Sequence, residues 1–82
     1  MAKIFQLGIY SEEKTIYEGQ IISLTAPSVS GYLGVLADHA PLAAKLKPGV
    51  ITFKDISGKA ASIAMQSEGY LEVLHNKATI LL

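Results

Sequence analysis

The chain is built from short segments in which apolar and polar residues alternate, and these segments are separated by residues that favour turns. Alternation with a period of two places successive side chains on opposite faces of a β-strand, so that one face is buried and the other exposed. No long segment repeats with the helical period of 3.6. The sequence therefore predicts an all-β protein. Alternation is clearest at 5–9, 22–26, 51–53, 61–65 and 71–73.

Turn signals divide these segments at regular intervals. A four-residue hairpin connection fits Asp55 to Gly58, because glycine can adopt the positive φ that such a loop requires. Asn76, after His75, tolerates the same left-handed region and predicts a two-residue hairpin turn. About nine candidate strands result, which is typical of a sandwich or small barrel. The expected breaks are 11–14, Gly19, 27–31, 48–49, 55–58 and 75–76.

One segment is open to two interpretations. Residues 39–47 are rich in helix-forming residues, but the segment spans only about two turns and ends at Pro48. Leu42, Ala44 and Leu46 also fit a period of two. We therefore expect an extended segment here and assign residues 1–82 to a single β-sandwich domain.

The composition excludes several classes of function. Seven basic and seven acidic residues give a formal net charge of zero, so the electrostatic attraction that dominates nucleic-acid binding is missing. Without cysteine, disulfides and cysteine-based zinc sites are impossible. Charged residues make up 17% of the chain against a typical value of about 25%. A small domain should be more polar than average, so we expect part of its apolar surface to be covered by a partner.

No targeting or membrane-spanning segment is predicted. No stretch approaches the ~20 apolar residues that cross a bilayer. The N-terminal residues carry one charge and are soon interrupted by Gln6 and Gly8, which does not match a signal peptide. The residues alone therefore favour a cytosolic compartment.

Motifs for catalysis, cofactors and metals are missing from the sequence. Gly58-Lys59 lacks both the first glycine and the final hydroxyl of a phosphate-binding loop. The only histidines, His39 and His75, are 36 positions apart, and Asp38-His39 supplies too few ligands for zinc. We therefore predict no catalytic residue, no cofactor and no metal.

Two other functions stay open from the residues alone. A small biotinyl- or lipoyl-type carrier domain would be modified on a lysine at a hairpin, for which Lys54 or Lys59 is the candidate. A small hydrolase would pair His39 with a nearby serine nucleophile. Neither has the sequence context that such functions usually show.

A run in the middle of the chain is distinctive. Residues 31–42 read GYLGVLADHAPL, and residues 46–50 read LKPGV. Residues 68–73 read EGYLEV, and residues 76–81 read NKATIL. In order and spacing these motifs resemble the epsilon subunit of rotary F-type ATP synthases over nearly the whole chain.

The resemblance implies a fold and a role. The fold would be a flattened antiparallel β-sandwich or barrel of about ten short strands. The role would be that of a non-catalytic subunit of the central stalk, which links the gamma subunit to the membrane c-ring and couples proton transport to ATP synthesis. Such a subunit lies at the cytoplasmic side of the bacterial inner membrane as a peripheral component. Family members continue into a C-terminal helical hairpin, which we expect to be absent from residues 1–82.

The resemblance also implies two partner-binding regions. Tyr32 stands where many members have an acidic residue, so an aromatic contact would replace a charged one. Asp38 stands where glycine is common, so the turn before His39 is expected to differ in backbone geometry. The residues implied to face gamma are Ser11, His39, Ala40, Pro41 and Leu42. The residues implied to face the polar loops of the c-ring are Ser28, Val29, Ser30, Gly31, Tyr32 and Leu33.

Overall fold

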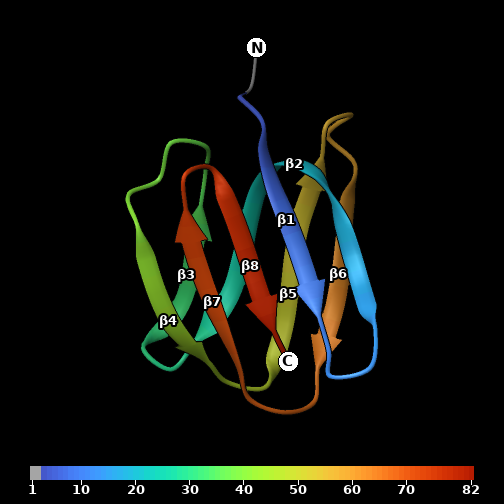
Figure 1. The fold of residues 1–82 in the computed structure, drawn as a ribbon, viewed down its shortest axis with the longest axis vertical. Helices are drawn as coiled ribbons and strands as arrows, with labels where there is room; N and C mark the ends of the chain where they lie inside the picture. The colour runs from blue at the N-terminus through green and yellow to red at the C-terminus, as the bar shows by residue number, and fades with distance from the viewer. Residues whose placement is uncertain (1–2) are drawn as a thin grey trace.

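Two layers of β-strands make up the computed structural model, which describes residues 3–82 (Figure 1). The fold class is confirmed: the described residues form an all-β sandwich, with eight strands in place of the expected ten or so. The strands are β1 (Phe5–Tyr10), β2 (Thr15–Ser28), β3 (Gly31–Val35), β4 (Leu42–Leu46), β5 (Gly49–Asp55), β6 (Ala60–Met65), β7 (Gly69–Leu74) and β8 (Lys77–Leu81).

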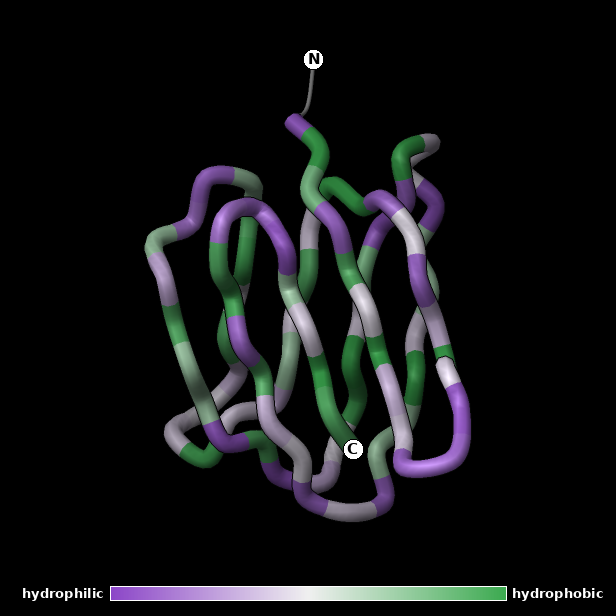
Figure 2. The backbone as a smooth tube through the Cα atoms, viewed as in Figure 1, coloured by the Kyte–Doolittle hydropathy of each residue, from purple (hydrophilic) through white to green (hydrophobic). Residues whose placement is uncertain are grey.

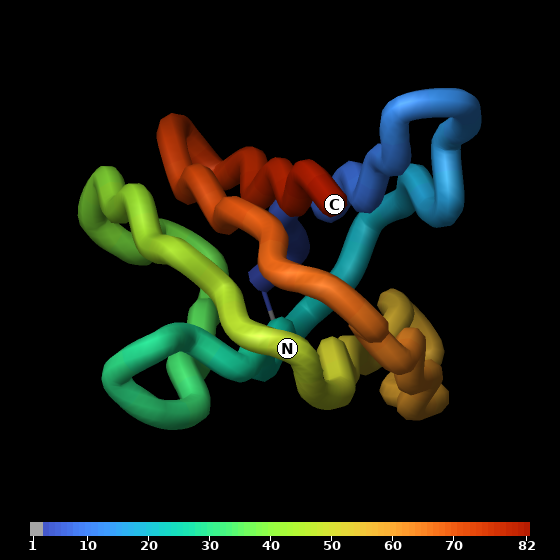
Figure 3. The backbone as a smooth tube through the Cα atoms, turned by 90° about the horizontal axis from the view of Figure 1, so that it is seen from below, coloured from blue at the N-terminus to red at the C-terminus, as the bar shows by residue number. Residues whose placement is uncertain are grey.

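The long strand β2 belongs to both layers. Its first half pairs with β1, and its second half pairs with β3 and β5. The front layer therefore consists of β4, β7, β8, β1 and the first half of β2, and the back layer consists of β3, the second half of β2, β5 and β6. Figure 3 shows the two layers facing each other when the molecule is viewed from below. The pairing of β1 with β8 is parallel, and the others are antiparallel.

The sequence predicted a break at Gly19, and this prediction was wrong, because β2 continues through Gly19. Two expected strands are therefore one, which lowers the number of strands. A β-carbon built on Gly19 would lie 2.6 Å from the hydroxyl oxygen of Tyr17. The glycine therefore makes room for an aromatic ring within the strand and does not end it.

A β-bulge bends β2 from the front layer to the back layer. The register with β5 shifts between Ile21 and Ser23, which leaves Ile22 as the extra residue. Because a bulge interrupts the alternation of faces, Ile21 and Leu24 are both buried, while Ile22 is half-buried. The expectation that Ile22 alternates in phase with Leu24 on the packed face is therefore wrong.

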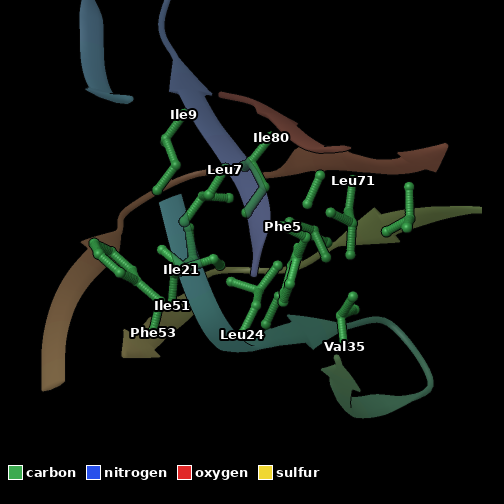
Figure 4. Packing of buried hydrophobic residues seen from close by; sticks show 14 of the residues in the cluster. Phe5, Leu7, Ile9, Ile21, Leu24, Val35, Ile51, Phe53, Leu71 and Ile80 are labelled. Atoms are coloured by element: carbon green, nitrogen blue, oxygen red, sulfur yellow. The ribbon is translucent and has the colours of Figure 1, made fainter. Parts of the chain in front are cut away.

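The core lies between the two layers. Figure 4 shows apolar side chains from β1, β7 and β8 pointing toward those of β2 and β5. Tyr17 closes one side of the core, with its ring centroid 4.4 Å from that of Phe53. Along the strands hydrophobic and hydrophilic residues alternate (Figure 2), as a sheet with one buried face requires. The buried apolar residues are Phe5, Leu7, Ile9, Ile21, Leu24, Ala26, Val35, Leu46, Ile51, Phe53, Met65, Leu71, Val73, Ala78 and Ile80.

The predicted hairpin turns at 75–76 and 55–58 and the predicted extended segment within 39–47 are confirmed. His75 and Asn76 have φ values of 49° and 56°, which is the combination that a type I′ hairpin turn needs. Gly58 has a φ of 84° in the hairpin between β5 and β6. The segment that could have been a helix is extended, as β4. Among the described residues no helix is long and apolar enough to cross a membrane.

Candidate partner-binding surfaces

Within the described part of the chain, the acidic and histidine side chains do not gather into one cluster. Within residues 3–82, no group of three or more His, Asp or Glu side chains could share a metal ion. His39 is held locally, because its Nδ1 atom donates to the carbonyl oxygen of Ala40 at 2.7 Å. The remaining candidates for function are surfaces, and the exposed apolar side chains mark them. These are Ile4, Val29, Tyr32, Leu36, Val50, Ile56, Tyr70, Leu74 and Leu81.

The turn between β2 and β3 lies at the lower end of the molecule in Figure 1 and is fixed by hydrogen bonds. The buried Ser28 hydroxyl donates to the carbonyl oxygen of Gly31 at 2.5 Å and accepts from the amide of Ser30 at 3.3 Å. The amide of Val29 donates to the carbonyl oxygen of Lys45 on β4 at 3.1 Å. Gly31 has a φ of 125°, which side chains rarely tolerate. The turn is therefore a pre-organised projection.

This turn exposes some of its predicted contact residues and buries others. Val29 and Tyr32 are 56% and 64% exposed, and Ser30 is exposed beside them. Ser28 is buried, and Leu33 stands opposite Ala26 on the inner face of the back layer. The contact surface here is the tip of the turn and the ring of Tyr32.

The loop between β3 and β4 lies at the upper end in Figure 1 and is tied down through Asp38. Its carboxylate accepts from Lys3 Nζ at 2.6 Å and from Asn76 Nδ2 at 2.9 Å. Its amide donates to Asn76 Oδ1 at 2.5 Å. Asp38 has a φ of 64°, so it adopts the left-handed conformation that glycine favours.

The hydrogen bond from Lys3, followed by that from Asn76, holds the pKa of the Asp38 carboxyl below its ordinary value. A carboxyl whose pKa is depressed on folding stabilises the folded state above its unfolded pKa, and this contribution is lost as the pH falls through the folded pKa. We expect Lys3→Ala to raise the pKa of Asp38 and to flatten the acid limb of the stability curve. Carboxyl chemical shifts in an NMR titration measure this pKa. An unchanged Asp38 pKa in Lys3→Ala would contradict the assignment.

The residues implied to face gamma do not form one cluster. Ser11 follows β1 at the lower end, where its amide donates to the carbonyl oxygen of Lys14 at 2.9 Å. His39, Ala40 and Pro41 lie in the loop at the upper end, and Leu42 begins β4. Both groups adjoin strands of the front layer. Any single partner that touches both must extend along the outer face of that layer.

That outer face carries a transverse row of larger side chains, which we call the front-face row: Tyr10, Tyr70 and Leu81. Tyr70 is opposite Leu81 in the pairing of β7 with β8, and Leu81 is opposite Tyr10 in the pairing of β8 with β1. Tyr70 and Leu81 are 57% and 52% exposed. Ala43 and Thr79 line a shallow groove beside them. Paired residues share a face, so the row is continuous across three strands.

The front-face row was not predicted, although the sequence contains a signal for it. The alternation at 71–73 places Leu71 and Val73 on one face of the strand, which leaves Tyr70 and Leu74 on the opposite face. Apolar residues on the polar side of a strand indicate a covered surface. At the far end of the row the Tyr10 hydroxyl donates to Glu18 Oε2 at 2.7 Å, and this hydrogen bond raises the pKa of Tyr10.

The fold is that of a small β-sandwich domain whose surface carries exposed apolar side chains. Residues 4–82 match the family model of the β-sandwich domain of the ATP synthase delta/epsilon chain, and the chain belongs to this family. It is similar to the ATP synthase epsilon chain of Natranaerobius thermophilus, at 39% identity over 79 residues. It is also similar to that of Dichelobacter nodosus, at 35% identity over 82 residues.

The alignments cover nearly all of this chain but only part of its relatives. They span 96% and 100% of the chain, and 56% of each of the two epsilon chains. The fold is also that of a chain in the Euglena gracilis mitochondrial ATP synthase, in a structure of OSCP, F1 and c-ring, with a TM-score of 0.85 and 23% identity. That match covers 92% of this chain and 48% of the other. The 82 residues thus correspond to the β-sandwich part of an epsilon chain.

Proposed function

We propose that the domain is a non-catalytic linker of the ATP synthase central stalk, which binds the gamma subunit with one face and the polar loops of the c-ring with one end. The two contacts would keep the rotation of the ring and of the shaft coupled, and so couple proton transport to ATP synthesis. The observation that carries the proposal is the family match over residues 4–82 together with two separate exposed apolar surfaces. In a bacterial cell it would lie at the cytoplasmic side of the inner membrane, held there by the complex.

The outer face of the front layer supports the gamma contact. Ser11 and His39 lie at opposite ends of this layer, and the front-face row crosses the layer near its lower end, beside Ser11. Paired strands on both sides of β8 make this face stiff, and close-packed interiors transmit strain with little deformation. A partner spread along the face would cover Tyr70 and Leu81 and would touch both predicted regions.

The lower end supports the c-ring contact. Val29 and Tyr32 project there from the hydrogen-bonded turn, and neither side chain is charged. Aromatic side chains are enriched where proteins bind each other, because a rigid ring buries a large area at a small entropic cost. The contact with the polar loops would therefore depend on packing more than on charge.

Replacing Tyr32 by alanine tests the c-ring contact. We expect the affinity for detergent-solubilised c-ring to fall about tenfold to a hundredfold, as for an aromatic anchor at an interface. Ile56→Ala is the matched control, because Ile56 is 61% exposed but lies in the hairpin at the upper end. Co-sedimentation with the ring measures both variants. Equal binding by Tyr32→Ala and the wild-type chain would argue against this contact.

Family membership favours the linker role over the two alternatives that the sequence left open. Lys59 lies in an exposed hairpin, but its amide donates to the Asp55 carboxylate at 3.0 Å in an ordinary turn network. His39 has no hydrogen bond to a serine among the described residues. Neither the carrier domain nor the hydrolase is retained.

A further inference from the structure

Strand β6 forms a rim of the back layer, and within residues 3–82 it is paired with β5 alone (Figure 3). An unpaired strand edge offers amide and carbonyl groups to another chain, and proteins usually block such edges with charges, proline or bulges. Two other rims carry such devices. The first half of β2 has Glu18 and a register shift, and β4 has Lys45.

The β6 edge has none of these devices. Its sequence, AASIAM, contains no charge, no proline and no glycine. Its register with β5 is regular through all six pairs, from Lys54 with Ala60 to Gly49 with Met65. Five of its six side chains are exposed or half-buried, and Ile63 is half-buried against the core. The edge is therefore open to pairing along its whole length.

We propose that this edge pairs with β6 of a second copy of the chain, antiparallel and centred on Ile63. Two neighbouring strands in a sheet must place opposite residues on the same face. Centring on Ile63 places Ile63 opposite its counterpart, and places Ser62 opposite Ala64. The first pair lies on the inner face and the second on the outer face, so the two back layers join into one sheet.

The charges that flank β6 favour the same arrangement. Lys59 immediately precedes the strand, and Glu68 follows its end by three residues. Antiparallel pairing brings each Lys59 to the end of the partner strand where Glu68 lies, whereas parallel pairing would put like charges together. Glu68 is 3.5 Å from Lys45 in the same chain but stays well exposed, so it can also attract a second cation. A second copy thus fits the edge in register, in the face of the sheet on which opposite side chains lie, and in the charges that flank the strand.

Sedimentation of the 82-residue chain over a concentration series tests the proposal. We expect a reversible dimer with a Kd on the order of 100 µM, because pairing one strand buries less than the ~1,200 Å² of a standard interface. Ser62→Lys with Ala64→Lys should raise this Kd at least tenfold, since it places like charges opposite each other. Thr25→Lys is the control, because Thr25 is exposed on the same outer face but lies within the sheet.

Cross-linking tests the register. An equal mixture of Ser62→Cys and Ala64→Cys chains should form a disulfide heterodimer faster than either variant forms a homodimer. Dimerisation should also slow hydrogen exchange of β6 amides and leave the amides of β3 unaffected. A chain that stays monomeric up to ~1 mM, well above the expected Kd, would overturn the proposal, as would dimerisation equally strong in the double lysine variant. Preferred homodimers of Ser62→Cys would overturn the pairing centred on Ile63.

Discussion

Replacing Gly69 by alanine is expected to lower the free energy of unfolding by about 3 kcal/mol, the size of effect that overpacking of a rigid site produces. A β-carbon at this position would lie 2.6 Å from the carbonyl oxygen of Leu81. It would also lie 3.1 Å from Met65 Cε and 3.2 Å from Leu82 Cδ2. The carbonyl cannot move away cheaply, because β8 is paired with β7 on one side and with β1 on the other.

Gly34→Ala is the matched control for this prediction. Gly34 also lies in a strand, but a β-carbon there would meet nothing within 4 Å. We expect its unfolding free energy to be unchanged or up to about 1 kcal/mol higher, because alanine reduces the entropy of the unfolded chain. Urea unfolding of both variants gives the comparison. Similar unfolding midpoints for the two variants would contradict the packing described at Gly69.

The second large effect is expected at the front-face row. Tyr70→Glu with Leu81→Glu should weaken binding to the gamma subunit about a hundredfold or more, because hot-spot side chains each contribute about 2 kcal/mol or more. Two carboxylates would have to be desolvated beside the remaining apolar surface. Isothermal titration calorimetry with purified gamma measures the change, and circular dichroism checks that the double variant is folded.

Val50→Glu is the control for this substitution. Val50 is 41% exposed and lies on the back layer, where it stands opposite Ala64. We expect it to bind gamma as the wild-type chain does. If Val50→Glu weakened binding as much as the double variant, the outer face of the front layer would not be the gamma contact.

Most of the fold could be predicted from the sequence because two signals agree. Alternation identifies the strands, and residues that tolerate positive φ identify the turns, as at His75 and Asn76. The continuity of β2 could not be predicted, because Gly19 is a turn residue by composition and a space for Tyr17 only in three dimensions. The bulge at Ile22 depends on register with β5, which local alternation does not contain.

The candidate surfaces could be predicted less completely. Motif matching marked Tyr32 and His39, and both lie where a partner could reach them at least in part. It gave no role to Tyr70, although this residue lies within the matched motif at 68–73. The row that Tyr70 forms with Leu81 and Tyr10 exists only once β1 and β8 pair in parallel. Local sequence does not encode that long-range pairing.

The measurement that tests the linking role most directly is a three-component binding experiment. Gamma, detergent-solubilised c-ring and this chain are mixed, and the gamma that sediments with the ring is quantified with and without the chain. We expect the chain to increase the gamma bound to the ring, and the increase to be lost with Tyr32→Ala or with the Tyr70 and Leu81 double variant. Retention of gamma that is the same with and without the chain would contradict the proposed link.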